Sequence, residues 1–124
     1  MTDDLQAPIR DRLRVALRAA MISRDTLAVD AIRTALAAID NAEAVEIADT
    51  TAFSVSRIAG SVVGVGAAEV PRRSLTETEM AELVEREAAD RRCAAEGYEQ
   101  EGYPRRAAEL RDSAAVLDEL LHAA

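Results

Sequence analysis

Few residue types in this chain could carry catalysis, and they do not form a recognisable set. Cys93 is the single cysteine and His122 the single histidine, so the chain cannot assemble the ligands of a zinc site without carboxylates. No histidine lies close in sequence to Cys93 as a base partner, and we expect this cysteine to pack as a small apolar residue. Lysine is absent, which excludes Schiff-base and P-loop lysine mechanisms.

Two short patterns suggest cofactor or metal sites but lack essential parts. Gly64-Val65-Gly66 has Glu69 where a dinucleotide-binding motif needs its third glycine, so we interpret it as a loop. Glu119 and His122 have the spacing of a di-iron bundle motif, but one chain with one histidine cannot provide the second copy. The sequence therefore predicts no catalytic residue, no bound cofactor and no metal ligand.

A row of arginines is the strongest binding signal. Arg10, Arg14 and Arg18 recur every four residues, which places them on one face of a helix. Such a row could contact the phosphates of a nucleic acid. It could equally form salt bridges with the acidic third helix, or remain solvated. The sequence leaves these three alternatives open.

The hydrophobic pattern predicts an all-α fold. Aromatic residues make up only 2% of the 124 residues, and the abundant alanines favour closely packed helices over a sheet. Apolar residues recur at helical spacing in four segments, near 4–23, 26–44, 76–102 and 104–121. We expect one domain over 1–124, a four-helix bundle-like arrangement of two antiparallel helix pairs, 4–44 and 76–121.

Local signals mark where these helices begin and end. Asp25 or Thr26 can cap the second helix, and Thr76 with Glu79 forms a potential capping box at the start of the third. Gly102 is a potential stop for the third helix, directly before Pro104. The glycine-containing segment 46–73 has no sustained helical period, so we expect a long flexible connection with a short helical turn at most.

Charge and hydropathy limit the partners and the location. The net charge is -8, and nearly all of the acidic excess falls in residues 74–124, whereas residues 1–40 are neutral overall. A polyanion would therefore be repelled less by the N-terminal half. The acidic start of the chain does not resemble a signal peptide, and its least polar stretch, 58–68, is too short to cross a bilayer. We expect a cytoplasmic protein without a membrane partner.

A set of residues stands in a fixed order along the second and third predicted helices: Arg33, Asn41, Glu43, Arg91, Arg92, Tyr98 and Gly102. In this order and spacing the chain resembles the GatB/YqeY family. The end of the second helix, the start of the third and the paired arginines that follow carry the resemblance, together with a glycine-rich segment typical of a variant with a longer central connection. The resemblance covers nearly all of the chain. Its motif positions are the residues of this set.

The resemblance implies an all-helical domain related to the tail of the GatB subunit of glutamine-dependent tRNA amidotransferases. In that enzyme the tail handles tRNA, while the carbon–nitrogen ligase reaction with glutamine as amide donor takes place in another domain. Most relatives continue through a Tyr-Leu-Pro segment into a second helical module, which this sequence lacks after Leu121. The implied partners are tRNA or an amidotransferase complex.

Three functions remain open from the sequence, and an enzyme whose site the sequence does not reveal is the least favoured of them. The first is an accessory, tRNA-associated helical module of the amidotransferase kind. The second is a non-catalytic protein-interaction or self-associating helical module with no role in RNA binding. The sequence does not indicate an oligomeric state or any catalysis by this chain on its own.

Overall fold

Four helices form the described part of the chain. In the computed structural model, which describes residues 7–57 and 75–122, they are α2 (Ile9–Ser23), α3 (Thr26–Arg57), α5 (Glu77–Gln100) and α6 (Pro104–Leu121). These residues contain no strand. The predicted all-α, bundle-like fold is therefore confirmed. Within the same residues, no helix is long and apolar enough to span a membrane.

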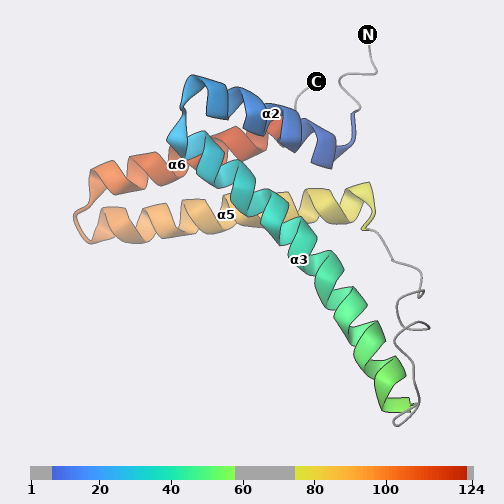
Figure 1. Cartoon of the computed structure of the whole chain (residues 1–124). Helices are drawn as coiled ribbons and strands as arrows, with labels where there is room; N and C mark the ends of the chain where they lie inside the picture. Colours follow the sequence, from blue (N-terminus) through green and yellow to red (C-terminus); the bar gives the residue numbers. More distant parts are fainter. Residues whose placement is uncertain (1–6, 58–74, 123–124) are drawn as a thin grey trace.

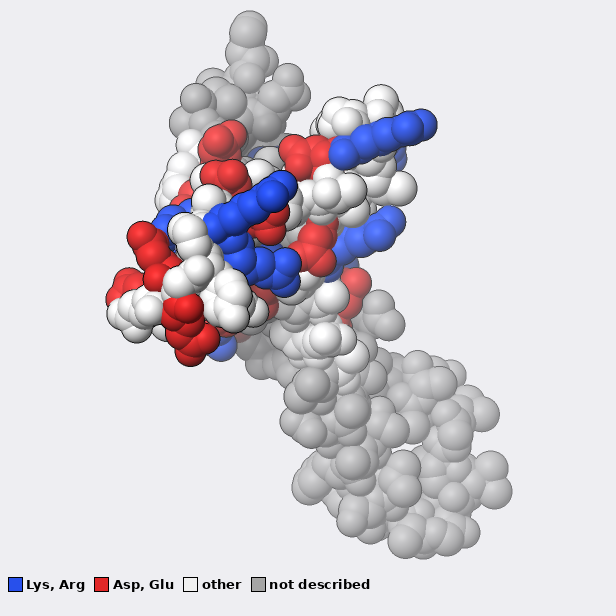
Figure 2. All heavy atoms as spheres, turned by 90° about the vertical axis from the view of Figure 1, so that its left-hand side faces the viewer, with Lys and Arg blue, Asp and Glu red and all other residues white. Residues whose placement is uncertain are grey.

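The helices follow one another as two hairpins (Figure 1). A short turn joins α2 to α3, and a second turn joins α5 to α6, which lie antiparallel and side by side. Helix α2 lies next to α6, and α3 crosses α5 at a large angle. Acidic and basic side chains are interspersed over the end of the molecule that contains both turns (Figure 2). That face therefore offers no continuous basic area.

The local start and stop signals act as the sequence predicts. The Thr76 side chain accepts a hydrogen bond from the Glu79 amide while the Glu79 carboxylate accepts one from the Thr76 amide, which completes the capping box. The Asp25 carboxylate accepts from the Ala28 amide at 3.2 Å at the start of α3. Gly102 adopts a φ of 90° in the turn between α5 and α6, a conformation that glycine accepts at little cost.

Two predicted helix boundaries differ from the structure. Helix α2 begins at Ile9 with Pro8 as its N-cap, so residues 7 and 8 do not belong to the helix expected from residue 4, and residues 4–6 lie outside the described residues. The second helix does not end near residue 44 but continues to Arg57, so the predicted connection 46–73 is wrong in its first part. No glycine or proline interrupts 26–57, and helix propagation needs no amphipathic stripe once a helix has formed. Residues 58–73 of that connection lie outside the described residues.

Helix α3 is consequently the longest of the described helices. Its 32 residues span about 48 Å, and its C-terminal part extends away from the other three helices in Figure 1. The buried residues of α3 with described side chains lie between Ala28 and Glu43. The helix bundle is thus built on the N-terminal half of α3.

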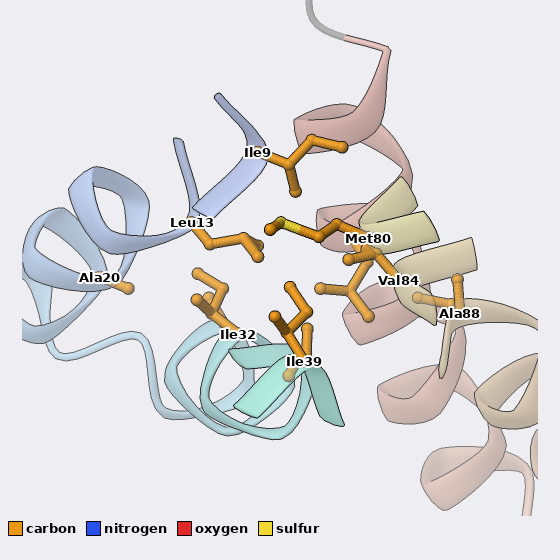
Figure 3. Packing of buried hydrophobic residues seen from close by; sticks show 13 residues of the cluster. Ile9, Leu13, Ala20, Ile32, Ile39, Met80, Val84 and Ala88 are labelled. Atoms are coloured by element: carbon orange, nitrogen blue, oxygen red, sulfur yellow. The ribbon is translucent and has the colours of Figure 1, made fainter. Parts of the chain in front are cut away.

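The core is aliphatic, and alanine fills the close contacts. Leu13, Ile32, Ile39, Val84 and Leu117 have at most 1% of their surface exposed. Side chains from α2, α3 and α5 converge there (Figure 3). Alanines with at most 1% exposure line the helix contacts, where their small size lets the backbones approach closely. They are Ala31, Ala35, Ala88, Ala95, Ala107 and Ala114.

The capping box provides a test of the α5 start. Replacing Thr76 with alanine removes the acceptor for the Glu79 amide, and we expect the free energy of unfolding to fall by about 1 kcal/mol. Urea unfolding followed by circular dichroism measures the loss. Thr78→Ala is the matched control, because Thr78 is exposed in the same helical turn. Equal losses in both variants would contradict a capping role for Thr76.

Candidate interface on helix α2

The arginine row on α2 divides into one structural residue and two exposed ones. The Arg10 guanidinium donates to a Glu43 carboxylate oxygen at 2.8 Å and lies 3.8 Å from Asp40. Only 23% of the Arg10 side chain and 10% of the Glu43 side chain are exposed. The hydrogen bond to Glu43, reinforced by attraction to that carboxylate, to Asp40 and to Asp11, raises the pKa of Arg10. Arg10 is therefore engaged within the fold.

Glu43 connects three elements at this point. Its second carboxylate oxygen accepts a hydrogen bond from the Leu75 amide at 3.3 Å, just before α5. Glu43 on α3 thus links Arg10 on α2 to the beginning of α5. Next to this link, the Ile9 amide at the start of α2 donates to Glu77 at 2.9 Å. Of the alternatives for the arginine row, salt bridging holds for Arg10, although its partner lies on the second helix and not on the third.

Arg14 and Arg18 point into solvent. Both side chains are exposed, and neither forms a hydrogen bond or an ion pair within residues 7–57 and 75–122. Arg12, which lies between Arg10 and Arg14 in the sequence, donates to the Leu120 carbonyl at 2.7 Å and so ties α2 to the end of α6. Two guanidinium groups one helical turn apart therefore remain available to an external partner.

The same side of α2 exposes large apolar side chains, which the sequence analysis did not single out. Val15 is 65% exposed and Ile22 77%, the highest values among the large hydrophobic residues that the structure describes. Seven residues separate the two, so they lie on one stripe of the helix, with Ala19 exposed between them. Met21, at the end of the predicted apolar stripe, is 50% exposed and not in the core.

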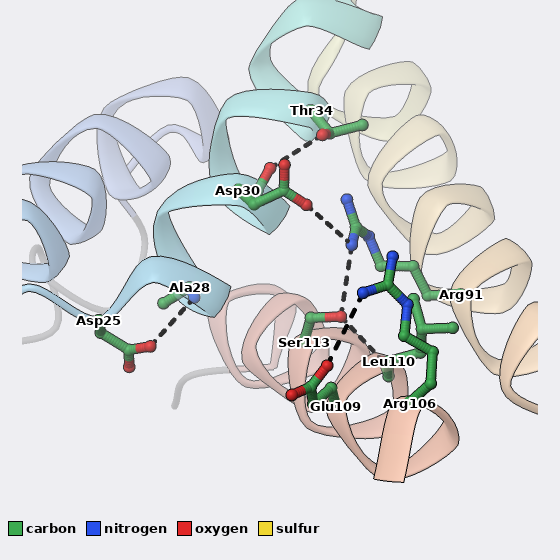
Figure 4. A network of polar contacts seen from close by, with 9 residues as sticks. All are labelled: Asp25, Ala28, Asp30, Thr34, Arg91, Arg106, Glu109, Leu110 and Ser113. Atoms are coloured by element: carbon green, nitrogen blue, oxygen red, sulfur yellow. Dashed lines mark hydrogen bonds and ion pairs between the residues drawn. The ribbon is translucent and has the colours of Figure 1, made fainter. Parts of the chain in front are cut away.

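Two of the motif positions bind α5 to its neighbours. Arg91 lies 3.3 Å from both Asp30 on α3 and the Ser113 hydroxyl on α6, so it joins three helices (Figure 4). Arg92 donates to Asp118 on α6 at 2.8 Å. Most of the Arg91 side chain is buried, with 13% exposed. This arginine pair thus stabilises helix packing.

Tyr98 and Gly102 belong to the turn between α5 and α6. The Tyr103 amide donates to the Tyr98 carbonyl at 2.8 Å, and the two rings meet edge to face with centroids 6.1 Å apart. The Arg106 guanidinium lies 5.8 Å from the Tyr98 ring centroid. A pocket of about 410 Å³ opens here, lined by residues from Gly102 to Arg106 and by Glu109. These contacts close the hairpin, and sequence reasoning missed the pairing of the two tyrosines.

The remaining candidates are not brought together. Arg33 and Asn41 are exposed on α3, and His122 is exposed just after α6. Cys93 is free and exposed, so the expectation that it packs inside is wrong, because its position on α5 faces away from the core. Among the side chains that the structure describes, no three of the metal-binding types gather. Residues 64–66 lie outside the described residues.

Comparison of the chain with family models, curated proteins and solved structures finds no match. The outer surface of α2, with its arginines and apolar residues, is therefore the candidate site that the structure itself presents.

Proposed function

We propose that this chain is an accessory helical module that associates with tRNA, of the kind that the GatB/YqeY resemblance implies. The observation that carries the proposal is the exposure of Arg14 and Arg18 without a partner in the described structure. Exposed guanidinium groups bind phosphate oxygens in a bidentate manner. The resemblance supplies tRNA as the nucleic acid, and a cytoplasmic site of action follows from that partner.

The charge distribution supports α2 as the contact surface. Residues 1–40 carry equal numbers of arginines and acidic residues, whereas residues 74–124 carry the acidic excess. A phosphate backbone that approaches α2 meets less repulsion than one that approaches α5 or α6. The aromatic residues Tyr98 and Tyr103 lie on the α5–α6 turn and not on α2. We therefore expect contacts to phosphates and not to stacked bases.

Within this proposal the chain itself binds and does not catalyse. Glu43, Arg91 and Arg92, which carry part of the resemblance, are engaged in contacts between helices. Their role is to hold α2 and the other helices in place. Amide transfer, the carbon–nitrogen ligase reaction with glutamine as donor, belongs to an associated amidotransferase.

Salt dependence of tRNA binding tests the proposal. If Arg14 and Arg18 each neutralise one phosphate, the logarithm of affinity should fall with the logarithm of salt concentration with a slope of about 1.4–1.8 from these two contacts. Changing both arginines to glutamine should remove that part of the slope and weaken binding. Fluorescence titration of labelled tRNA at several salt concentrations measures both quantities. We expect Arg10 to contribute less to this slope, because its guanidinium already donates to Glu43.

A charge-matched control separates a specific contact from net charge. Arg86 on α5 and Arg105 on α6 are exposed arginines without a partner among the described residues. Changing these two to glutamine alters the net charge by the same amount but leaves α2 intact. Equal loss of affinity in the two double variants would contradict a contact at α2. Undetectable binding at low salt would contradict the tRNA association altogether.

A second candidate function has its own observation. Val15 and Ile22 expose apolar surface next to the α2 arginines, and a phosphate backbone gains nothing from apolar contacts. Exposed apolar stripes on a helix are typical of surfaces that bind another protein. This observation favours a protein-interaction or self-associating module. A pull-down with wild type and with Val15→Asp, followed by identification of both protein and RNA, distinguishes the two functions.

A further inference from the structure

We infer that the outer face of α2, defined as Pro8, Asp11, Val15, Arg18, Ala19 and Ile22, pairs antiparallel with the same face of a second copy of this chain. The inference rests on the second candidate function and names its partner. All six residues of this face are exposed. The two with the largest apolar side chains, Val15 and Ile22, are 65% and 77% exposed.

The spacing of the apolar residues suits a helix pair. Pro8, Val15 and Ile22 are each separated by seven residues, which is the repeat that keeps a seam facing a partner helix. In an antiparallel pair with its two-fold axis at Val15, the Val15 side chains of the two copies contact each other. Pro8 of each chain then lies opposite Ile22 of the other. Every apolar side chain of the stripe thus contacts another apolar side chain.

The charges on the face are complementary in the same arrangement. Asp11 and Arg18 flank the stripe on one side, because they are also separated by seven residues. A two-fold axis perpendicular to both helices places this side of each helix on the same side of the pair. Asp11 of one chain then lies next to Arg18 of the other, and symmetry produces this pair twice. Ala19 on the opposite side of the stripe adds no charge and little bulk.

The charges on this face suit a second copy of the chain. Neither Asp11 nor Arg18 forms an ion pair within the described part of the molecule, so both are free to pair between chains. A second copy also covers Val15 and Ile22, which are 65% and 77% exposed. Helix α2 has 15 residues and spans about 22 Å. That is short for a stable interface, so we expect a concentration-dependent dimer.

The mass of the full chain in solution tests the inference. Sedimentation equilibrium from micromolar to near-millimolar concentration should show wild type changing from the chain mass of 13.3 kDa to twice that mass. Val15→Asp should remain monomeric throughout, because two carboxylates would meet at the symmetry axis. Ala37→Asp adds the same charge at an exposed position on α3 and should dimerise as wild type does. Circular dichroism confirms that each variant is folded.

Charge reversal tests the antiparallel register. Asp11→Arg alone, or Arg18→Asp alone, should weaken dimerisation about tenfold, because symmetry makes each change act twice. The double variant Asp11→Arg/Arg18→Asp should recover wild-type dimerisation. A wild type that stays monomeric, a dimer that survives Val15→Asp, or a double variant that stays as weak as the single ones would each overturn the inference. All masses are measured without RNA, so the outcome of this test does not depend on whether the chain binds tRNA.

Discussion

Replacing Leu13 or Ile32 with alanine is expected to lower the free energy of unfolding by about 2–5 kcal/mol. Each side chain is 1% exposed, and the two meet where α2 and α3 face Val84 on α5 (Figure 3). Alanine loses the burial of several methyl and methylene groups and leaves a cavity that helices held by neighbouring contacts cannot fully close. Urea unfolding monitored by circular dichroism measures the change.

An exposed residue on the same helix is the control. Val15→Ala removes apolar atoms from a side chain that is 65% exposed, and we expect a change within about 0.5 kcal/mol in dilute solution. The contrast between Leu13 and Val15 then reports burial and not helix propensity, which changes in both variants. A loss below about 0.5 kcal/mol for Leu13→Ala would place Leu13 on the surface.

Replacing Glu43 with alanine is expected to cost about 2–3 kcal/mol, because it leaves the Arg10 guanidinium without its main partner. Arg10 is 23% exposed, so water compensates for part of the loss. The variant also removes the acceptor of the Leu75 amide, which loosens the chain before α5. The free energy of unfolding, measured with urea, checks this expectation.

A double-mutant cycle isolates the ion pair from the other contacts of Glu43. Arg10→Met and Glu43→Met are made singly and together, and both retain an apolar stem of similar length. If the pair is coupled, the double variant loses less stability than the sum of the single variants, because no charge is left unpaired. Additive losses would contradict a direct interaction between Arg10 and Glu43.

Features that depend on a few consecutive residues could be predicted from the sequence. The capping box of Thr76 and Glu79, the Asp25 cap and the helix start at Pro104 are all formed as expected. Each of these signals acts within one helical turn, so its partners are adjacent in the sequence. The aliphatic core followed in the same way from helical spacing. The end of α3 did not, because a helix that has formed can continue without an amphipathic stripe.

The α2–α3 turn contains a left-handed backbone conformation that its residue type does not indicate. Arg24 adopts a φ of 61° at the end of α2, a conformation for which glycine or asparagine is the usual signal. The backbone amides of Arg24 and Asp25 close the turn, because they donate hydrogen bonds to carbonyls in the last turn of α2. The surrounding hydrogen bonds impose this backbone on a residue that does not prefer it. The apolar pattern nevertheless predicts the end of this helix at residue 23, where α2 ends.

By itself, the sequence determined the four helices of the described residues, the caps at Asp25 and Thr76, and the spacing that puts Arg10, Arg14 and Arg18 on one helix face. Only the tertiary structure decided which of these arginines is available. Glu43 lies far along the chain from Arg10, and α3 must fold back onto α2 before the two side chains meet at 2.8 Å. The exposure of Val15 and Ile22 was decided in the same way, because helical periodicity places residues on faces but does not say which face a neighbouring helix covers.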